Sequence, residues 1–409
     1  MKQHTFRLLA ALLLAPLASL HAAETVAPAA PRAETAPGLT VRQNRLWLGK
    51  QPYRGIGVNY CDLFGELLER PKSERTLDGL RFLGEKKIPF VRFWACGFWP
   101  SDWKLYFEDK TEWFRRMDMV VRTAEEAGVG LIPSLFWRTE TFPNLFGETL
   151  DAWGDPKSKT RKFMADYTAE VVSRYRSSPA IWGWEFANEL NLACDLPNWD
   201  LFLPVSIPHA GVNLEKIPAN RMTYKIAGAA WKAFAEEVRK LDPHRFITTG
   251  NAAPREGSWN NAKNGTFKED DSSQAREAFR WMHPPPNDLV SVHLYPKPGE
   301  KLRYAGVEGL EKVLRKYKSF SNLSNSPLFV GEFCSNRYES KDPVPLDAFR
   351  CEVQEIIDAL VKTQVDLSAF WVFDYTPDRK EAGIIRKDNE YAWILDSIIE
   401  ANGRLSAQP

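Results

Sequence analysis

Residues 181–189 have the sequence Ile-Trp-Gly-Trp-Glu-Phe-Ala-Asn-Glu, an apolar run that ends in Asn188 and Glu189. A second short run, Leu328-Phe-Val-Gly-Glu332, also ends in a glutamate. Neither run has the regular polar alternation of a half-exposed strand, which is typical of parallel strands buried on both faces. The two glutamates are therefore expected at the carboxyl ends of two buried strands, predicted over residues 181–187 and 328–333.

Outward from these two runs, six others of the same character predict further strands, over residues 53–60, 88–95, 129–136, 245–249, 289–295 and 367–375. Amphipathic stretches between the runs predict helices, over residues 112–127, 160–175, 221–241, 346–363 and 391–399. Strand and helix in regular alternation predict an α/β fold, a single (β/α)8 TIM barrel. Residues 41–51 are expected to form a hairpin at the bottom of this barrel.

Three segments that follow predicted strands are long: residues 137–157, 190–220 and 250–271. The active sites of (β/α)8 barrels are built from such loops, at the carboxyl ends of the strands. Loops of this length in a compact domain are uncommon and often functional. We therefore expect these three loops to wall a substrate cleft.

The predicted strand ends bring further polar side chains into the same cleft. They are Arg92, Asn188, His293 and Tyr295. Four tryptophans, Trp94, Trp137, Trp259 and Trp371, are candidate surfaces for stacking a sugar ring, although most of the 15 tryptophans are expected to fill the core. Asp374, beyond Trp371, is expected to pair with a loop arginine.

Two carboxylates that face one cleft are what cleavage of a glycosidic bond requires. One protonates the leaving oxygen while the other attacks or stabilises the oxocarbenium-like carbon. The second carboxylate must be ionised, so it needs donors and positive charge, and Arg92 and the Tyr295 hydroxyl suit Glu332 in this respect. Asn188 suits the sugar 2-hydroxyl, and His293 can orient the substrate or a neighbouring side chain.

Each of these residues also has an ordinary structural explanation. Asn188 and Glu189 are common at helix N-termini, and Arg92 is also compatible with a structural ion pair low in the barrel. The matching apolar runs before Glu189 and Glu332 favour the catalytic interpretation. Glu185 lies four residues before Glu189, so it is expected on the same strand face but deeper, as a buried and paired carboxylate.

The segments that carry these residues resemble glycoside hydrolase family 5 and, more broadly, the clan A retaining glycosidases. This resemblance implies that Glu189 is the acid/base and Glu332 the nucleophile, with carboxyl groups about 5–5.5 Å apart and retention of configuration. The matching segments are Val91-Arg-Phe-Trp94, Trp184-Glu-Phe-Ala-Asn-Glu189, Val292-His-Leu-Tyr295, Val330-Gly-Glu-Phe333 and Phe370-Trp371.

Within the family, residues 184–189 and 242–250 are similar to endo-β-mannanases. Many endoglucanases carry Asp-x-His at the end of strand three, where this chain has Ser134-Leu-Phe136. The resemblance therefore favours β-1,4-mannan over β-glucan. Two alternatives remain open: a catalytically silent carbohydrate-binding barrel, and an exo-acting β-mannosidase or β-glucosidase.

The composition of the chain argues against several other classes of binding partner. The 409 residues carry 54 Lys and Arg against 53 Asp and Glu, which argues against nucleic acid or an anionic membrane surface. The five cysteines match no zinc motif, and their odd number leaves at least one unpaired, with one disulfide still possible. We expect a monomer that needs no metal and no cofactor.

The N-terminus has the pattern of a secretory signal, because basic residues precede an apolar run over 8–20 and small residues follow at Ala22 and Ala23. The protein is therefore expected to be secreted or periplasmic, without a membrane anchor after cleavage. The expected organisation is a signal peptide over 1–23, a flexible leader over 24–38 and a glycoside hydrolase catalytic domain over 39–402.

Overall fold

The computed structural model describes residues 38–407, except 202, 204–205, 298, 340–344 and 377–380. The predicted signal peptide, and all of the predicted leader except Gly38, lie outside the described residues. The main sheet has eight strands, ordered β8-β7-β6-β5-β4-β13-β12-β9. They are β4 (Gly55–Asn59), β5 (Phe90–Trp94), β6 (Gly130–Ser134), β7 (Gly183–Glu185), β8 (Phe246–Thr248), β9 (Val290–Leu294), β12 (Leu328–Phe333) and β13 (Leu367–Phe370).

The sheet closes into the predicted barrel. All neighbouring strands are parallel, and the two strands at the ends of the order are joined by the parallel bridge between Thr248 and Leu289. Each predicted strand contains one of the eight observed strands. Most observed strands are shorter, because apolar residues such as the fully buried Phe186 and Ala187 continue beyond the strand into the loop.

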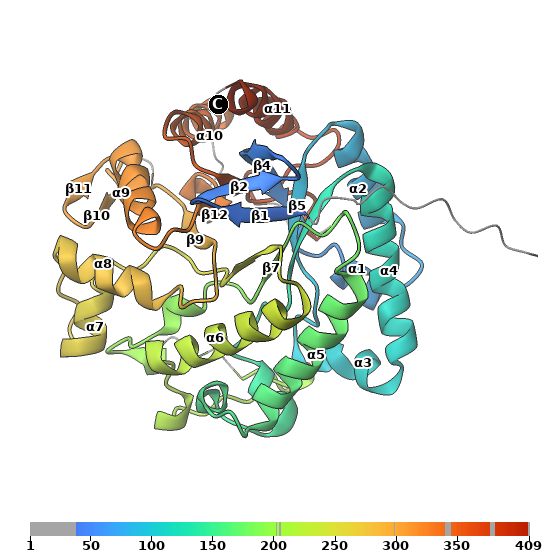
Figure 1. Cartoon of the computed structure of the whole chain (residues 1–409), viewed down its shortest axis with the longest axis vertical. Helices are drawn as coiled ribbons and strands as arrows, with labels where there is room; N and C mark the ends of the chain where they lie inside the picture. Colours follow the sequence, from blue (N-terminus) through green and yellow to red (C-terminus); the bar gives the residue numbers. More distant parts are fainter. Residues whose placement is uncertain are drawn as a thin grey trace, which may run out of the picture. The chain divides into compact units, whose positions relative to one another are not determined.

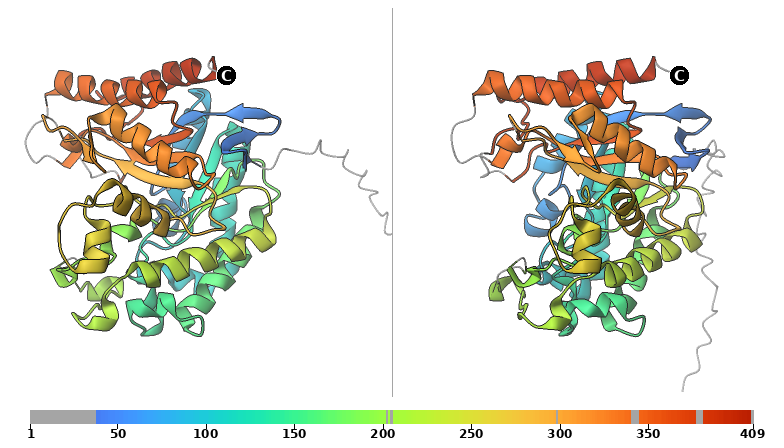
Figure 2. Two further views of the ribbon diagram at one scale, coloured as in Figure 1. Left: turned by 60° about the vertical axis from the view of Figure 1, so that its left-hand side comes forward. Right: turned by 90° about the vertical axis from the view of Figure 1, so that its left-hand side faces the viewer.

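Helices surround the strands, and α10 and α11 lie next to each other (Figure 1). Two further views show these two helices, coloured orange-red to dark red, from the side (Figure 2). The predicted helices correspond to α4, α5, α6, α10 and α11, whereas the others were not predicted. The helices are α1 (Gly65–Glu69), α2 (Arg75–Glu85), α3 (Lys104–Glu108), α4 (Lys110–Ala127), α5 (Lys159–Tyr175), α6 (Tyr224–Leu241), α7 (Ser258–Asn264), α8 (Ser272–Trp281), α9 (Leu310–Asn322), α10 (Leu346–Lys362) and α11 (Trp393–Ser406).

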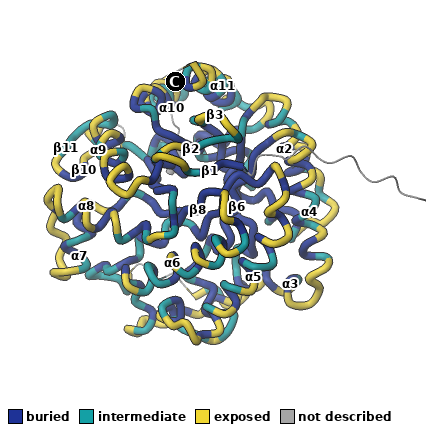
Figure 3. Tube along the Cα trace, viewed as in Figure 1, coloured by how far each residue is buried: buried dark blue, intermediate teal, exposed yellow. Residues whose placement is uncertain are grey.

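Helix α4 shows why these segments are helical. Its buried residues recur every three or four positions from Trp113 to Ala124, which gives the helix one apolar stripe. The Asp109 side chain accepts a hydrogen bond from the Glu112 amide and caps the first turn. The helix ends at Gly128, whose φ of 69° suits a residue without a Cβ. The core lies between such stripes and the strands, and exposed residues lie mostly outside it (Figure 3).

The predicted hairpin closes the bottom of the barrel and has a third strand. Strands β1 (Leu39–Arg42), β2 (Arg45–Leu48) and β3 (Gln51–Tyr53) form an antiparallel sheet. The Leu39 amide donates to the Trp182 carbonyl at 2.9 Å, next to the start of β7. Leu39 and Leu46 are fully buried in a separate apolar cluster with Trp182 and residues from the lower barrel.

All five cysteines lie in the described part of the chain, and each is a free thiol. Four are buried and Cys351 is exposed. The disulfide that the sequence left open is therefore not formed in this structure. Among the described helices, none is both long and apolar enough to cross a membrane.

Candidate active site

Glu189 lies four residues beyond the end of β7, on a tight turn above the barrel. Its amide donates to the Gly250 carbonyl at 2.9 Å, and the Asn188 amide donates to the Trp137 carbonyl at 3.3 Å. Glu189 itself has φ 54° and ψ 23°, a left-handed conformation that is costly for a residue with a side chain. Such conformations occur where surrounding contacts hold a functional side chain in place.

Glu332 lies on β12, at an irregularity in the pairing of this strand with β9. Its side chain is 5% exposed. Arg92 Nη1 donates to Oε1 at 2.8 Å, and the Tyr295 hydroxyl donates to Oε2 at 2.6 Å. Both oxygens of Glu332 therefore accept hydrogen bonds, one of them from a cation, and these bonds fix the orientation of the carboxylate.

Arg92 on β5 connects the site to the barrel interior. Its guanidinium is fully buried and also donates to Asn59 and to Asn188 Oδ1, at 3.0 and 2.9 Å. Nε donates to both oxygens of Glu185, at 2.8 and 2.9 Å. Burial opposes the charge of Arg92, but the carboxylates of Glu185 and Glu332 outweigh it and raise the pKa of Arg92. Glu185 is the buried, paired carboxylate that was expected, with its pKa raised by burial.

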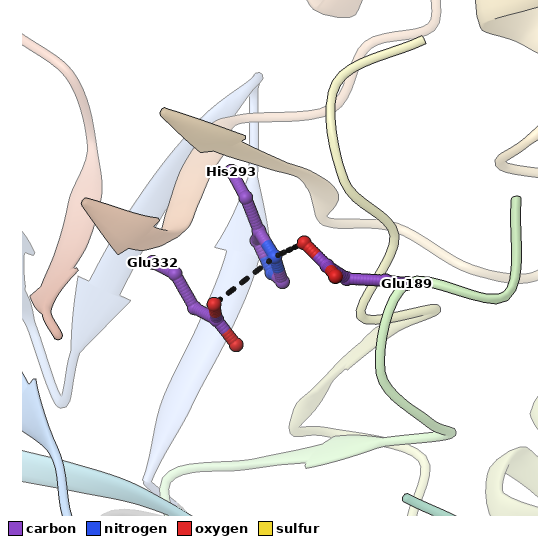
Figure 4. A group of neighbouring side chains, drawn as sticks. All are labelled: Glu189, His293 and Glu332. Carbon is purple, nitrogen blue, oxygen red and sulfur yellow. Dashed lines mark hydrogen bonds and ion pairs between the residues drawn. The ribbon is translucent and has the colours of Figure 1, made fainter. Parts of the chain in front are cut away.

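His293 on β9 lies between the two glutamates (Figure 4). Its Nδ1 is 2.7 Å from Glu189 Oε1 and 3.5 Å from Glu332 Oε2. Burial lowers the pKa of His293 to about 3, so the imidazole is neutral near pH 7. With its proton on Nε2, the neutral imidazole accepts a hydrogen bond at Nδ1 from protonated Glu189. With its proton on Nδ1, it donates a hydrogen bond to ionised Glu189. His293 therefore fits a residue that orients Glu189.

The two glutamates occupy different surroundings. The Glu189 side chain is 31% exposed, whereas that of Glu332 is 5% exposed and receives two strong donors. One oxygen of each carboxylate and a His293 nitrogen all lie within 4.8 Å of one another. Inverting glycosidases need about 6.5–9.5 Å between the carboxyl groups to admit a water, so this close approach fits the retaining geometry.

A cavity of about 430 Å³ opens beside Glu189. All three long loops contribute to it, as predicted: Trp137 and Leu150 come from the first, Trp199 from the second and Arg255 from the third. Its apolar and aromatic wall with a few polar groups is typical of a small-molecule binding site. The loops thus form a cleft above the strand ends.

The predicted tryptophans lie at different depths. Trp371 is half-buried at the end of β13, with its ring 5.9 Å from that of Tyr375. Trp94 is 5% exposed and packs against Phe98 and Trp137. Trp137 lines the cavity, and the Arg92 guanidinium lies 4.5 Å from its ring centre. The roles of Trp94, Trp137 and Trp371 as sugar platforms stay predictions.

Several site residues were not identified from the sequence, among them Asn59, Tyr375 and Arg255. Asn59 accepts from Arg92 and donates to the Gly331 carbonyl, and its place at the end of the first barrel strand was an available signal. Tyr375 and Arg255 line the cavity from loops. Loop residues such as these have no periodicity that marks which of them turn inward, so only the folded structure brings them together.

Comparison with known proteins agrees with this geometry. Residues 69–375 match the family model described as Cellulase (glycosyl hydrolase family 5). The mannan endo-1,4-beta-mannosidase A of Podospora anserina is 38% identical over 81 residues, which cover 18% of this chain and 21% of that protein. The mannan endo-1,4-beta-mannosidase F of Aspergillus fumigatus is 32% identical over 134 residues, or 28% of this chain and 30% of that protein. The chain therefore matches less than a third of the length of either curated relative.

Solved structures share the fold. The endo-1,4-beta-mannanase from Rhizomucor miehei superposes with a TM-score of 0.62 and 17% identity, covering 91% of this chain and 100% of that chain. The exo-beta-1,4-mannosidase Op5Man5 from Opitutaceae bacterium strain TAV5 gives 0.58 and 15% identity, covering 90% of this chain and 63% of that chain. At these identities the likeness concerns the fold, which is the predicted (β/α)8 barrel.

Proposed function

The chain belongs to the cellulase family, glycosyl hydrolase family 5, and we propose that it is a retaining endo-hydrolase of β-1,4-linked mannan. The observation that carries the proposal is the asymmetric pair of carboxylates, Glu189 and Glu332, on either side of neutral His293. Two carboxylates at short range, one held ionised and one partly exposed, are what double displacement at an anomeric carbon requires.

In the proposed reaction, Glu332 attacks the anomeric carbon while Glu189 protonates the glycosidic oxygen. Arg92 and Tyr295 hold Glu332 ionised and in position for attack. The covalent glycosyl-enzyme is then hydrolysed by a water from which Glu189, now ionised, takes a proton. His293 keeps a hydrogen bond to Glu189 in both of its protonation states, because a neutral imidazole can donate or accept.

Asn188 is proposed to contact the substrate. Its side-chain oxygen accepts from Arg92, so the amide NH2 group is oriented away from the guanidinium and available to a sugar hydroxyl. Trp371 and Trp137 are proposed to form sides of the sugar-binding sites. Trp137 does so from the wall of the cavity beside Glu189. Trp94, which packs behind Trp137, is proposed to support that wall.

The choice of mannan rests on two supports. The curated relatives named above are mannan endo-1,4-beta-mannosidases, although the matched stretches are short. The end of β6 continues as Leu135-Phe136-Trp137, without the Asp-x-His of many endoglucanases. We also propose that the protein is exported and monomeric. The segment that would direct export lies outside the described residues.

Glu332→Ala tests the mechanism. The variant is expected to lose hydrolysis, because no nucleophile remains, and added azide is expected to restore turnover with a glycosyl azide of inverted configuration as product. NMR of the product on an aryl β-mannoside gives that configuration. Full activity of the variant without azide contradicts the assignment of Glu332.

Product analysis tests the substrate. Purified protein is incubated with β-mannan, β-glucan, xylan and defined manno-oligosaccharides. Oligosaccharides of mixed length from mannan support endo action, whereas mannose as the only early product identifies an exo-mannosidase. Sugar binding without product from every substrate identifies a carbohydrate-binding barrel instead.

A further inference from the structure

The two glutamates and His293 form a group with three potential metal ligands. Within the described residues, one oxygen from each glutamate and one nitrogen from His293 all lie within 4.8 Å of one another. The group comes from three different strand ends, so it is held by the barrel and not by one flexible loop. Imidazole with carboxylates is a donor set that suits zinc.

The distances are close to those of a zinc site. Tetrahedral zinc with bonds of about 2.0–2.2 Å places its ligand atoms about 3.3–3.5 Å apart. His293 Nδ1 and Glu332 Oε2 are already 3.5 Å apart. Nδ1 and Glu189 Oε1, at 2.7 Å, must separate by a small rotation of the Glu189 side chain, which is 31% exposed and lines the cavity.

The ring of His293 can present a lone pair at Nδ1. The other nitrogen, Nε2, is buried, and among the described residues no hydrogen-bond partner is found for it. A partner at one ring nitrogen usually decides which nitrogen carries the proton. Because no such partner is seen at Nε2, the proton can reside there and leave Nδ1 to bind a cation.

The local charge favours a cation. The single charge of Arg92 is shared between Glu185 and Glu332, and Arg255 lines the cavity near Glu189. Three carboxylates thus face two guanidinium groups, which leaves one negative charge in excess when Glu189 is ionised. Arg92 and Tyr295 also fix the orientation of Glu332, as supporting hydrogen bonds do for the ligands of known zinc sites.

We propose that Glu189, His293 and Glu332 form an inhibitory zinc site, in which Zn²⁺ binds to both catalytic carboxylates and prevents hydrolysis reversibly. The proposal rests on the catalytic assignment of these glutamates made above. A bound ion occupies the position of the scissile bond, removes the protonatable oxygen of Glu189 and ties up the nucleophilic oxygen of Glu332. Zinc and substrate therefore compete.

The experiment titrates ZnCl2 into the full-length enzyme during hydrolysis of manno-oligosaccharides, in a buffer that does not chelate metal. Inhibition is expected to be competitive with substrate and to be reversed fully by EDTA. In parallel, calorimetry measures Zn²⁺ binding to the wild type, to His293→Asn and to Glu332→Gln. One site is expected on the wild type. Its affinity is expected to fall by more than about 10- to 100-fold in each variant, because that is the typical loss when only a supporting partner of a ligand is removed.

The exposed thiol of Cys351 is the main competing explanation, and Cys351→Ser is the matched control. Cys351 lies on α10, away from the residues of the site, so the variant is expected to keep both its activity and its zinc inhibition. Loss of zinc inhibition in Cys351→Ser, or calorimetric affinity unchanged in His293→Asn, overturns the proposal.

The two proposals fail in distinguishable ways. Hydrolysis of mannan that millimolar zinc does not inhibit overturns the zinc site and leaves the proposed function intact. Stoichiometric zinc binding that depends on His293, in a protein that hydrolyses none of the tested glycans, contradicts the proposed function and retains the metal site.

Discussion

Arg92 combines a structural contact with a contact to the proposed nucleophile in one side chain. It donates to Glu185 deep in the barrel and to Glu332 at the cleft, and it is fully buried. Removing the cation that pairs with a buried carboxylate strongly destabilises a protein. Removing both partners often leaves the stability unchanged. The two roles are therefore separable by mutation.

Arg92→Met is expected to lower the free energy of unfolding by about 3–5 kcal/mol, because Glu185 is left as an uncompensated buried charge. The double variant Arg92→Met with Glu185→Gln is expected to recover part of that stability, because only Glu332 is then left without its cation. Its kcat/KM is expected to stay low by about 10²–10³-fold, because Glu332 still lacks its cationic donor. Urea unfolding and steady-state kinetics measure the two effects. Recovery of activity together with stability contradicts the chemical role of Arg92.

For single residues, the sequence was informative where both the residue type and its place in a predicted strand indicated a role. Arg92, Glu185 and Glu332 follow from their places in strands, because strand alternation decides which side chains face inward. Glu189 was expected at a strand end but lies on a turn beyond β7. The contact of His293 with both glutamates was not predictable, since it depends on the distance between strand ends that are far apart in the sequence.

At the scale of elements, an ion cluster joins the start of α2 to the loop after β13. Arg75 donates to Asp62 at 2.6 Å, to Glu66 at 3.0 Å and to the Asp374 side chain at 2.8 Å. Asp374 lies between Trp371 and Tyr375, and it also accepts from Arg386 at 2.6 Å, the loop arginine expected from the sequence. The cluster therefore positions the aromatic edge of the cleft.

Arg75→Gln is expected to raise KM several-fold with a smaller change in kcat, because Asp374, next to Tyr375, loses one of its anchors while the glutamates keep their partners. Arg70→Gln is the matched control, since Arg70 contacts Glu66 and no contact with Asp374 is seen. Kinetics on manno-oligosaccharides measure both constants. An equal rise of KM in both variants contradicts a positioning role for Arg75.

The same cluster predicts a pH dependence of stability. Burial raises the pKa of Asp62 to about 6, against the opposing effect of Arg75. A carboxyl whose pKa is higher in the folded than in the unfolded state stabilises the fold below about pH 4, and this contribution is lost as pH rises through 6. The stability of the wild type relative to Asp62→Asn is therefore expected to fall between pH 4 and pH 7. Urea unfolding of both proteins at several pH values measures this difference in the free energy of unfolding. A difference that rises with pH contradicts the raised pKa of Asp62.

The strands were predictable because each is a continuous apolar run, whereas several helices were not. Helix α8 begins with a capping box formed by Asp271 and Gln274, a signal that the sequence offered and that was missed. Helix α7 lies within the third long loop, where no long apolar stripe marks it. The wall of the cavity could not be predicted residue by residue, because it is made by loops that meet only in the folded barrel.

At the scale of the whole barrel, the two ends have separate tasks. The two glutamates of the proposed mechanism and the cavity lie at the carboxyl ends of the strands. The opposite end is closed by the sheet of β1, β2 and β3, whose Leu39 and Leu46 are fully buried among lower-barrel residues. In (β/α)8 barrels, residues at this lower end serve stability and those at the upper end serve function.

Leu46→Ala tests that division. Removal of a fully buried leucine side chain leaves a cavity, and the free energy of unfolding is expected to fall by about 2–5 kcal/mol. The hydrolytic constants of the folded protein are expected to stay within about twofold of wild type, because mutations at distant sites act independently. Leu48→Ala is the control, because Leu48 is half-buried in the same strand. It is expected to lower the free energy of unfolding by less than Leu46→Ala does. A large change in KM with Leu46→Ala contradicts the separation, because it means that packing at the bottom of the barrel sets the geometry of Glu189 and Glu332 at the top.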